Sequence, residues 1–320
     1  MKPKMLFTLI RLVIAIAMVL YLMQMGVIDW TSLSGLIIAW PYTLLAVILF
    51  FVATILQALR LQILINAHQM SLSYMAAVKL TLIGLFFSTY LPGATGGDLI
   101  KIYYASKENP GSKAEVITIL FLDRFMGLFS LLTLPVFLAP FFIDLIRSQE
   151  ILQALLILSL SISSSIVLIT FIAAKFELAD SKLIYWLNNK VRYGHFLSRA
   201  LHTIHYYKRS LGPLLKALAI SYFLQLLMVG VSFSIAEATN IFGADLKMLF
   251  LIPMGYMANS FPLTPGGLGI GEAAMESLFL LGGLTGGAET LLGWRLIMIL
   301  VGLLGLVYYL KGSKKFFSTP

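Results

Sequence analysis

The stretch that decides the fold reads Leu-Pro-Gly-Ala-Thr-Gly-Gly-Asp at residues 91–98. An apolar piece, Leu80 to Leu91, precedes it, and a second short apolar piece, Leu99 to Tyr104, follows it. Neither piece approaches the ~20 apolar residues with which a helix crosses a bilayer. Proline and clustered glycines do not sustain a helix between them. A short helix, a break and a second short helix predict a re-entrant helical hairpin.

A second break of the same kind, Phe-Pro-Leu-Thr-Pro-Gly-Gly-Leu-Gly-Ile-Gly-Glu, occupies residues 261–272. It lies between the short apolar pieces Leu246 to Ser260 and Ala273 to Leu284. Backbone groups freed inside a bilayer are costly unless protein, water or ligand satisfies them, so both breaks are expected to line a polar cavity. The residues assigned to the breaks are Pro92, Gly93, Gly96, Gly97, Pro262, Pro265, Gly269 and Gly271.

The composition around the two breaks is that of a membrane protein. Of 320 residues, 59% are hydrophobic and 12% are charged, whereas soluble domains have about 45–50% and about 25%. We predict an all-α, polytopic integral membrane protein with a single domain, residues 1–320. Six full spans are expected at Met5–Met25, Pro41–Ile65, Val116–Pro140, Ile151–Ala174, Leu214–Ala238 and Thr290–Leu310. The alternative counts each hairpin as a full span, which gives eight spans in total.

The two breaks lie in halves with the same layout, residues 41–140 and 214–310. Each half contains a span, a short piece, a break, a carboxylate and a span with an early arginine. Lysine and arginine gather at both termini and in residues 175–213, and such residues favour the cytoplasmic side. The first hairpin would then enter from the cytoplasm and the second from outside. This predicts the inverted-repeat architecture of many secondary transporters.

The basic segment, residues 175–213, also carries many aromatic residues. Such a composition is typical of an amphipathic helix in the headgroup layer, where it would gather anionic lipid at the cytoplasmic face. We expect a multi-pass protein of the cytoplasmic (inner) membrane with both termini in the cytoplasm. The net charge of +9 fits that topology, so nucleic acid is not an expected partner.

Charged residues of the spans and breaks define the candidate site. Arg124 and Arg295 lie within apolar spans, where charges usually face the protein interior. They are expected either to pair with carboxylates or to hold a lipid phosphate, which suits the planar guanidinium group. Asp98 and Glu272 begin the returning helices, either as first-turn caps or as contacts for cationic headgroups or protons. The residues assigned to substrate binding are Asp98, Lys101, Arg124, Thr264, Gly266, Gly267, Glu272 and Arg295.

Other polar residues do not point to an enzyme. Arg60 falls near the end of a span and is expected as an interfacial anchor. Lys101, one turn after Asp98, is expected in the same role, with assistance to the substrate site as the alternative. The chain has no cysteine, and three histidines of the basic segment (His195, His202 and His205) have no acidic neighbours, so neither a metal nor a cofactor is expected. We expect no catalytic activity, because no nucleophile–base or ATP-binding pattern is present.

Three motifs resemble the lysylphosphatidylglycerol synthase transmembrane (flippase) family. They begin with Leu91-Pro92-Gly93 and continue to Lys101, and they include Phe121-Leu122-Asp123-Arg124-Phe125 and the stretch from Pro262 to Ala274. The resemblance covers roughly residues 5–310. It implies a region similar to a flippase that moves aminoacylated phosphatidylglycerol outward, beside which a separate cytosolic domain attaches the amino acid in multidomain members. No such domain is expected after Leu310, so this chain resembles the stand-alone members.

These observations predict a lipid flippase-like transporter for a phospholipid or a lipid-linked phosphate. Membrane phospholipids are the expected partners, together with a second copy of the chain or a lipid-modifying enzyme. Two alternatives stay open at this point. One is a non-catalytic membrane partner of a lipid-modifying or glycosyl-transferring enzyme. The other is a membrane-embedded enzyme acting on lipid headgroups, which would need a nucleophile or metal cluster.

Overall fold

The computed structural model describes residues 30–68, 70–90, 96–175, 203, 206, 211–239, 245–260, 264 and 267–311. The predicted span Met5–Met25 and almost all of the basic segment lie outside the described residues. The same holds for five residues assigned to the breaks or the site, namely Pro92, Gly93, Pro262, Pro265 and Gly266.

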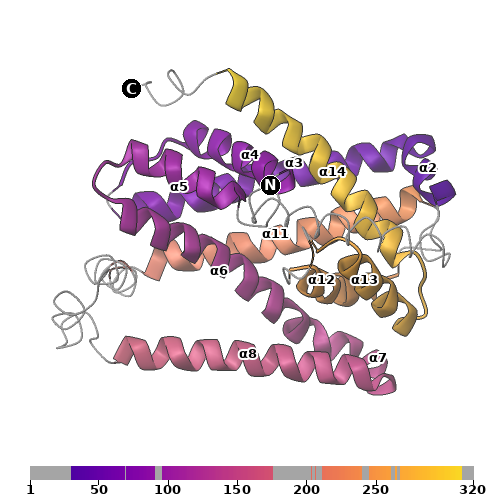
Figure 1. Cartoon of the computed structure of the whole chain (residues 1–320). Helices are drawn as coiled ribbons and strands as arrows, with labels where there is room; N and C mark the ends of the chain where they lie inside the picture. Colours follow the sequence, from indigo (N-terminus) through magenta and orange to yellow (C-terminus); the bar gives the residue numbers. More distant parts are fainter. Residues whose placement is uncertain are drawn as a thin grey trace, which may run out of the picture.

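The described part of the chain is helical and contains no strand (Figure 1). Its elements are α2 (Trp30–Ile38), α3 (Trp40–Ala67), α4 (Tyr74–Tyr90), α5 (Gly96–Glu108), α6 (Lys113–Leu138), the 3₁₀ turn η1 (Ala139–Phe142), α7 (Ile143–Ser148), α8 (Glu150–Lys175), α11 (Leu211–Ala238), α12 (Met248–Asn259), α13 (Ile270–Leu281) and α14 (Gly287–Leu310). Five segments are long and apolar enough to cross a membrane: α3, α6 with η1 and α7, α8, α11 and α14. The all-α polytopic membrane fold is therefore confirmed.

Helices α3 and α11 form the antiparallel centre of the bundle. Arg60 of α3 donates a hydrogen bond from Nη1 to Ser221 Oγ of α11 over 2.8 Å. Toward the other end, Gly230 of α11 leaves room for Leu49 of α3, whose Cδ1 would lie 3.3 Å from an added Cβ. The residue numbers rise along α3 while those of α11 fall. The last turn of α3 and the last turn of α11 therefore lie at opposite ends of the bundle.

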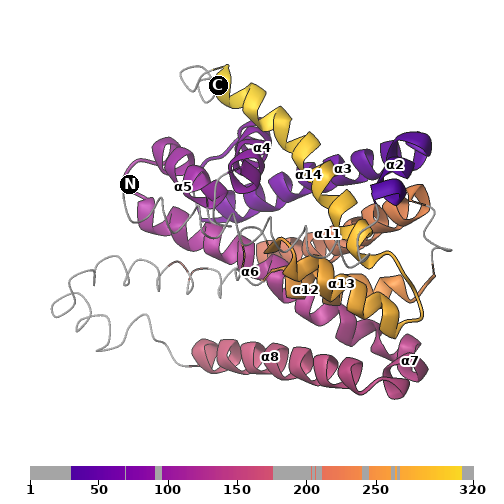
Figure 2. The same ribbon diagram turned by 45° about the vertical axis from the view of Figure 1, so that its right-hand side comes forward.

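Two short helical pairs, α4–α5 and α12–α13, lie where the sequence predicts hairpins. Helix α4 has 17 residues, α5 has 13, and α12 and α13 have 12 each, all below the ~20 needed for a span. The first pair follows the end of α3 and the second follows the end of α11. Because α3 and α11 are antiparallel, the hairpins begin at opposite ends of the bundle (Figures 1 and 2).

Close backbone contacts hold the first hairpin inside the bundle. Gly305 of α14 lies against the carbonyl of Leu82 in α4, and Gly302 lies against Phe86 one turn away. Within the hairpin, Gly97 of α5 lies against the carbonyl of Gly84 in α4. A Cβ at Gly305 or Gly97 would overlap these carbonyls, so small residues allow the helices to approach closely, as membrane helices often do. Helix α8 lies at the edge of the bundle against α6 and α7 (Figure 2).

Candidate functional site

Glu272 and Arg295 form a buried ion pair where the second hairpin returns. Glu272 lies in the first turn of α13 and is fully buried. Its Oε1 accepts a hydrogen bond from Arg295 Nε of α14 over 2.6 Å, and its Oε2 accepts one from the backbone N–H of Gly269 over 2.6 Å. A buried carboxylate needs such partners, because desolvation of an ion costs several kcal/mol. Glu272 is therefore a first-turn cap and also the partner of Arg295, while its contact with a cationic headgroup or a proton stays a prediction.

Asn259, the last residue of α12, completes this cluster. Its Oδ1 accepts a hydrogen bond from Arg295 Nη2 over 2.7 Å. Gly271 lies directly beneath the amide, since an added Cβ there would be 2.5 Å from Asn259 Oδ1. Arg295 thus joins the last residue of α12 to the first turn of α13 and to its own helix α14. The sequence reasoning missed Asn259, although its place immediately before the second break was visible.

Glycines give the second break its backbone shape. Gly267 has φ +72° and Gly269 has φ +83°, in a region that side-chain-bearing residues rarely adopt. Thr264 is buried, and its Oγ1 donates to the carbonyl of Leu268 over 2.8 Å, while its own carbonyl accepts from the N–H of Gly267 over 3.1 Å. Hydrogen bonds therefore tie Thr264 to Gly267 and Leu268, just before α13 begins. Substrate contact by Thr264 or Gly267 stays a prediction.

Asp98 and Arg124 form the corresponding pair in the first half. Asp98 lies in the first turn of α5, and its Oδ2 accepts a hydrogen bond from Arg124 Nη1 of α6 over 2.5 Å. The two side chains are 34% and 44% exposed, respectively. Gly96 and Gly97 precede Asp98 as the first residues of α5. The two halves thus share the chemistry of a carboxylate on a hairpin and an arginine on a long helix, but only the second pair is sealed from its surroundings.

A third ion pair, Arg60 with Asp123, was not predicted. Arg60 Nε donates to Asp123 Oδ1 over 2.7 Å, and both side chains are buried. The expectation that Arg60 is an interfacial anchor is wrong, because it lies in the core between α3, α6 and α11. Asp123 and Arg124 are neighbours on α6, and consecutive helix residues point about 100° apart. The two therefore serve different partners.

Lys101 of α5 is also buried, at 8% exposure. Its side chain crosses Gly84 of α4, where an added Cβ would lie 3.0 Å from Lys101 Cγ. The expectation of an interfacial anchor is wrong for this residue too, because its carbon stem occupies the space that Gly84 leaves. Among the described residues, no carboxylate forms an ion pair with its ammonium group. Lys101 lies one turn after Asp98, on the same hairpin helix.

Among the described residues, the two hairpin pairs are connected neither to each other nor to a metal-binding group. No hydrogen bond or ion pair between described residues joins the Asp98–Arg124 pair to the Glu272–Arg295 cluster. No group of three or more His, Asp or Glu side chains in the described ranges could hold a metal ion. A hydrogen bond of 2.7 Å between Tyr256 of α12 and Ser232 of α11 fixes the second hairpin against the central helices.

Comparison with known proteins places this arrangement in a family. Residues 8–305 match the family model described as "Lysylphosphatidylglycerol synthase TM region". No curated protein and no solved structure matches the chain. The matched range contains both hairpins and the three arginine–carboxylate pairs described above, and it confirms the resemblance carried by the motifs around Asp98, Arg124 and Glu272. The chain belongs to the lysylphosphatidylglycerol synthase transmembrane-region family.

Proposed function

We propose that this protein moves a phosphate-bearing lipid, either a phospholipid or a lipid-linked phosphate, across the cytoplasmic membrane. Membership in a family of lipid-synthase membrane regions supports a role connected with membrane lipid. The proposed step needs no bond to be made or broken. It needs a polar path for a headgroup through a bundle that is otherwise apolar.

The observation that carries this proposal is the Asp98–Arg124 pair, whose side chains are 34% and 44% exposed, respectively. Arg124 lies about 17 Å along α6 from its first residue, at ~1.5 Å per residue, and the hydrocarbon core is ~30 Å thick. A charged pair left partly open at that depth is costly, and such residues mark substrate paths. The guanidinium group of Arg124 suits a phosphate, and Asp98 suits a cationic headgroup.

The surface beside this pair is apolar. Leu99 and Tyr103 of α5 and Phe121 of α6 are well exposed large side chains. On a membrane-spanning bundle such side chains face lipid. A lipid lying against α5 and α6 would therefore bring its headgroup to Asp98 and Arg124 from the side, without first leaving the membrane.

The buried Glu272–Arg295 cluster would act as a second binding site for the lipid headgroup during its translocation. Breaking a buried ion pair by removing one partner costs about 3–5 kcal/mol. A phosphate that replaced Glu272 as the partner of Arg295 would offset that cost. The two proposed binding sites lie on hairpins that begin at opposite ends of the bundle, as in transporters that open alternately to the two sides of the membrane. The internal inverted repeat is part of this proposal.

The basic end of the bundle supports an orientation for the protein. The end of α5 and the start of α6 carry Lys107 and Lys113, the start of α11 carries Lys216, and the end of α14 is followed by Lys311. All four lie at the end where α3 finishes, and lysines near spans favour the cytoplasmic side. The first hairpin would then begin in the cytoplasm and the second outside.

The test is a leaflet-resolved lipid translocation assay in liposomes of phosphatidylglycerol and phosphatidylethanolamine. Arg124→Gln removes the charge at the open pair and should lower the translocation rate at least tenfold. Arg147→Gln makes the same change at an exposed arginine of α7 and should leave the rate unchanged. Normal translocation by Arg124→Gln would overturn the proposal. If only the activity of a co-purified lipid-modifying enzyme fell, the partner-subunit alternative would replace it.

A further inference from the structure

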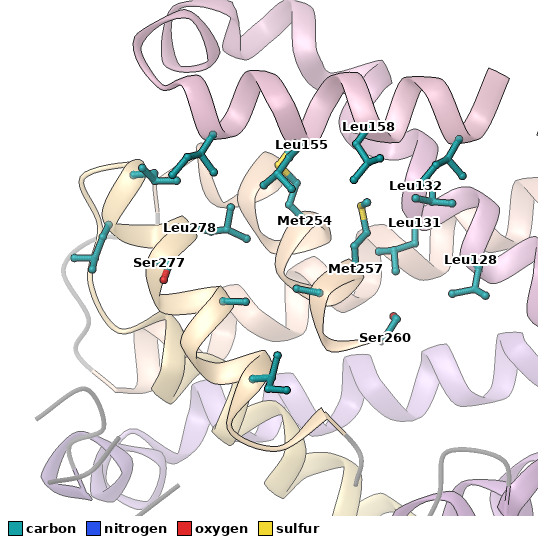
Figure 3. A pocket seen from close by; sticks show the side chains of 17 residues that line it. Leu128, Leu131, Leu132, Leu155, Leu158, Met254, Met257, Ser260, Ser277 and Leu278 are labelled. Atoms are coloured by element: carbon teal, nitrogen blue, oxygen red, sulfur yellow. The ribbon is translucent and has the colours of Figure 1, made fainter. Parts of the chain in front are cut away.

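A large apolar groove lies between α6, α8 and the second hairpin. Its volume is about 780 Å³, within the range of about 300–1,000 Å³ that ligand pockets occupy. Figure 3 shows the side chains that line it, including Leu128 and Leu131 of α6, Leu155 and Leu158 of α8, and Met254 and Met257 of α12. The functional pairs described above do not line this groove.

The groove is exposed on one side and buried at its floor. Leu158, on its α8 wall, is 51% exposed, whereas Met254 in its floor is 3% exposed. Only 17% of the apolar window of α8 is buried in the protein. A groove with an exposed rim and a buried floor, on a helix that crosses the membrane, is continuous with the acyl chains of the bilayer.

The two hydroxyl groups of the lining already donate hydrogen bonds to carbonyls one turn earlier in the chain. Ser260 Oγ donates to the carbonyl of Tyr256 over 2.7 Å, and Ser277 Oγ donates to the carbonyl of Ala273 over 2.8 Å. The other residues of the lining are aliphatic or methionine. A lipid headgroup placed here would lose its hydrogen bonds to water, and the lining offers few polar partners to replace them. A hydrocarbon chain has no such requirement and is the occupant that the lining fits.

The length of the groove also matches a chain. Its α8 wall runs from Ile151 to Ile162, which is about 17 Å at ~1.5 Å per residue. That is roughly half of the ~30 Å hydrocarbon core, the depth of one leaflet. Met254 and Met257 add flexible, polarisable side chains to the lining, and methionine adapts to irregular contacts. The groove should therefore accept acyl chains of different length.

Part of the groove borders the second break. Ser260, in the lining, directly follows Asn259, which accepts a hydrogen bond from Arg295. Ile270, also in the lining, is two residues before Glu272. We propose that the groove holds one acyl chain of the transported lipid while the Arg295 cluster receives its phosphate. This inference rests on the proposed transport function and adds the site for the apolar part of the substrate.

Photo-crosslinking tests the presence of the chain. The wild-type protein is placed in liposomes of phosphatidylethanolamine and a phosphatidylglycerol with a diazirine in one acyl chain, and peptide adducts are mapped by mass spectrometry. We expect adducts on the floor residues Met254 and Leu278. Phe250 of α12 is fully buried against Phe142 and does not line the groove, so it should carry none. Absence of floor adducts would show a closed or protein-filled groove and would overturn the inference.

A matched pair of variants tests the role of the chain in transport. Leu158→Trp fills the groove, whereas Ile157→Trp places the same side chain at the next residue, which is outside the lining and 63% exposed. We expect Leu158→Trp to remove the floor adducts and to lower lipid translocation at least tenfold, and Ile157→Trp to do neither. Loss of adducts with normal translocation would overturn the assignment to the transported lipid. Normal translocation by Arg124→Gln would instead contradict the proposed function and leave the adduct result standing.

Discussion

Arg295 and Glu272 are joined by a hydrogen bond of 2.6 Å between Nε and Oε1, and the carboxylate has no exposed surface. The pair links α13, the second helix of a hairpin, to the membrane-spanning α14. The same carboxylate caps α13 through the N–H of Gly269. One side chain therefore holds the break, the returning helix and the arginine in place together, so stability and transport must be separated by experiment.

The first prediction makes that separation at Glu272. Glu272→Ala leaves Arg295 as a buried charge without its carboxylate and should destabilise the protein by about 3–5 kcal/mol. The double variant Glu272→Leu with Arg295→Met replaces both ions by apolar side chains and should recover most of that stability. Thermal unfolding in detergent gives the stabilities, and the liposome assay gives the transport rates.

The double variant should not transport lipid, because no guanidinium group is left to bind a phosphate at this site. Recovery of transport together with stability would show that the pair only holds the fold.

The second prediction concerns Arg60 and Asp123. Arg60→Met leaves Asp123 buried without its partner and should cost about 3–5 kcal/mol of stability. Ser221→Ala removes one hydrogen bond to the guanidinium group and should cost about 1–3 kcal/mol. Because this pair lies in the core, Ser221→Ala should transport lipid at the normal rate once folded. A transport defect in a stable Ser221→Ala protein would place this pair on the path instead.

The third prediction concerns the glycines of the second break. Gly269→Ala forces a side chain into a φ of +83°, a sparsely populated backbone region, at a cost of about 1–3 kcal/mol. Gly271→Ala should displace Asn259, because the new Cβ would meet its Oδ1, and should weaken the hydrogen bond from Arg295. Gly212→Ala is the control, since nothing lies within 4 Å of its added Cβ. Thermal unfolding should rank Gly212→Ala as the most stable of the three.

The fourth prediction concerns the buried ammonium group of Lys101. Lys101→Met keeps a long side chain across Gly84 and removes the charge, which is expensive to bury. The variant should be at least as stable as the wild type but should translocate lipid more slowly, if the ammonium group contacts the phosphate beside Asp98. Gly84→Leu should instead lower stability, because it takes the space of the lysine stem. Unchanged transport in Lys101→Met would show that Lys101 contributes only to helix packing.

Several parts of this structure could be predicted from the sequence because they depend on neighbours along the chain. The short pieces around the two breaks are hairpin helices, although α4 begins at Tyr74 and not at Leu80. That difference arises because Lys79 interrupts the apolar run, whereas residues 74–78 before it are apolar and belong to the same helix. The pairing of Arg295 with a break carboxylate was one of two readings of an arginine in an apolar span, and a charge in such a place requires a partner.

By itself, the sequence determined the helical membrane fold, the positions of the breaks and the residues that must find polar partners. Composition, apolar length and the chemistry of proline and glycine act locally, so a single chain reveals them. Tertiary structure alone decided that Asp123 faces Arg60 while Arg124 faces Asp98, that Lys101 lies buried across Gly84, and that α6, α8 and the second hairpin enclose an apolar groove. Those relationships join residues far apart in the chain, and helix packing selects among the many partners that each charge or apolar face could have.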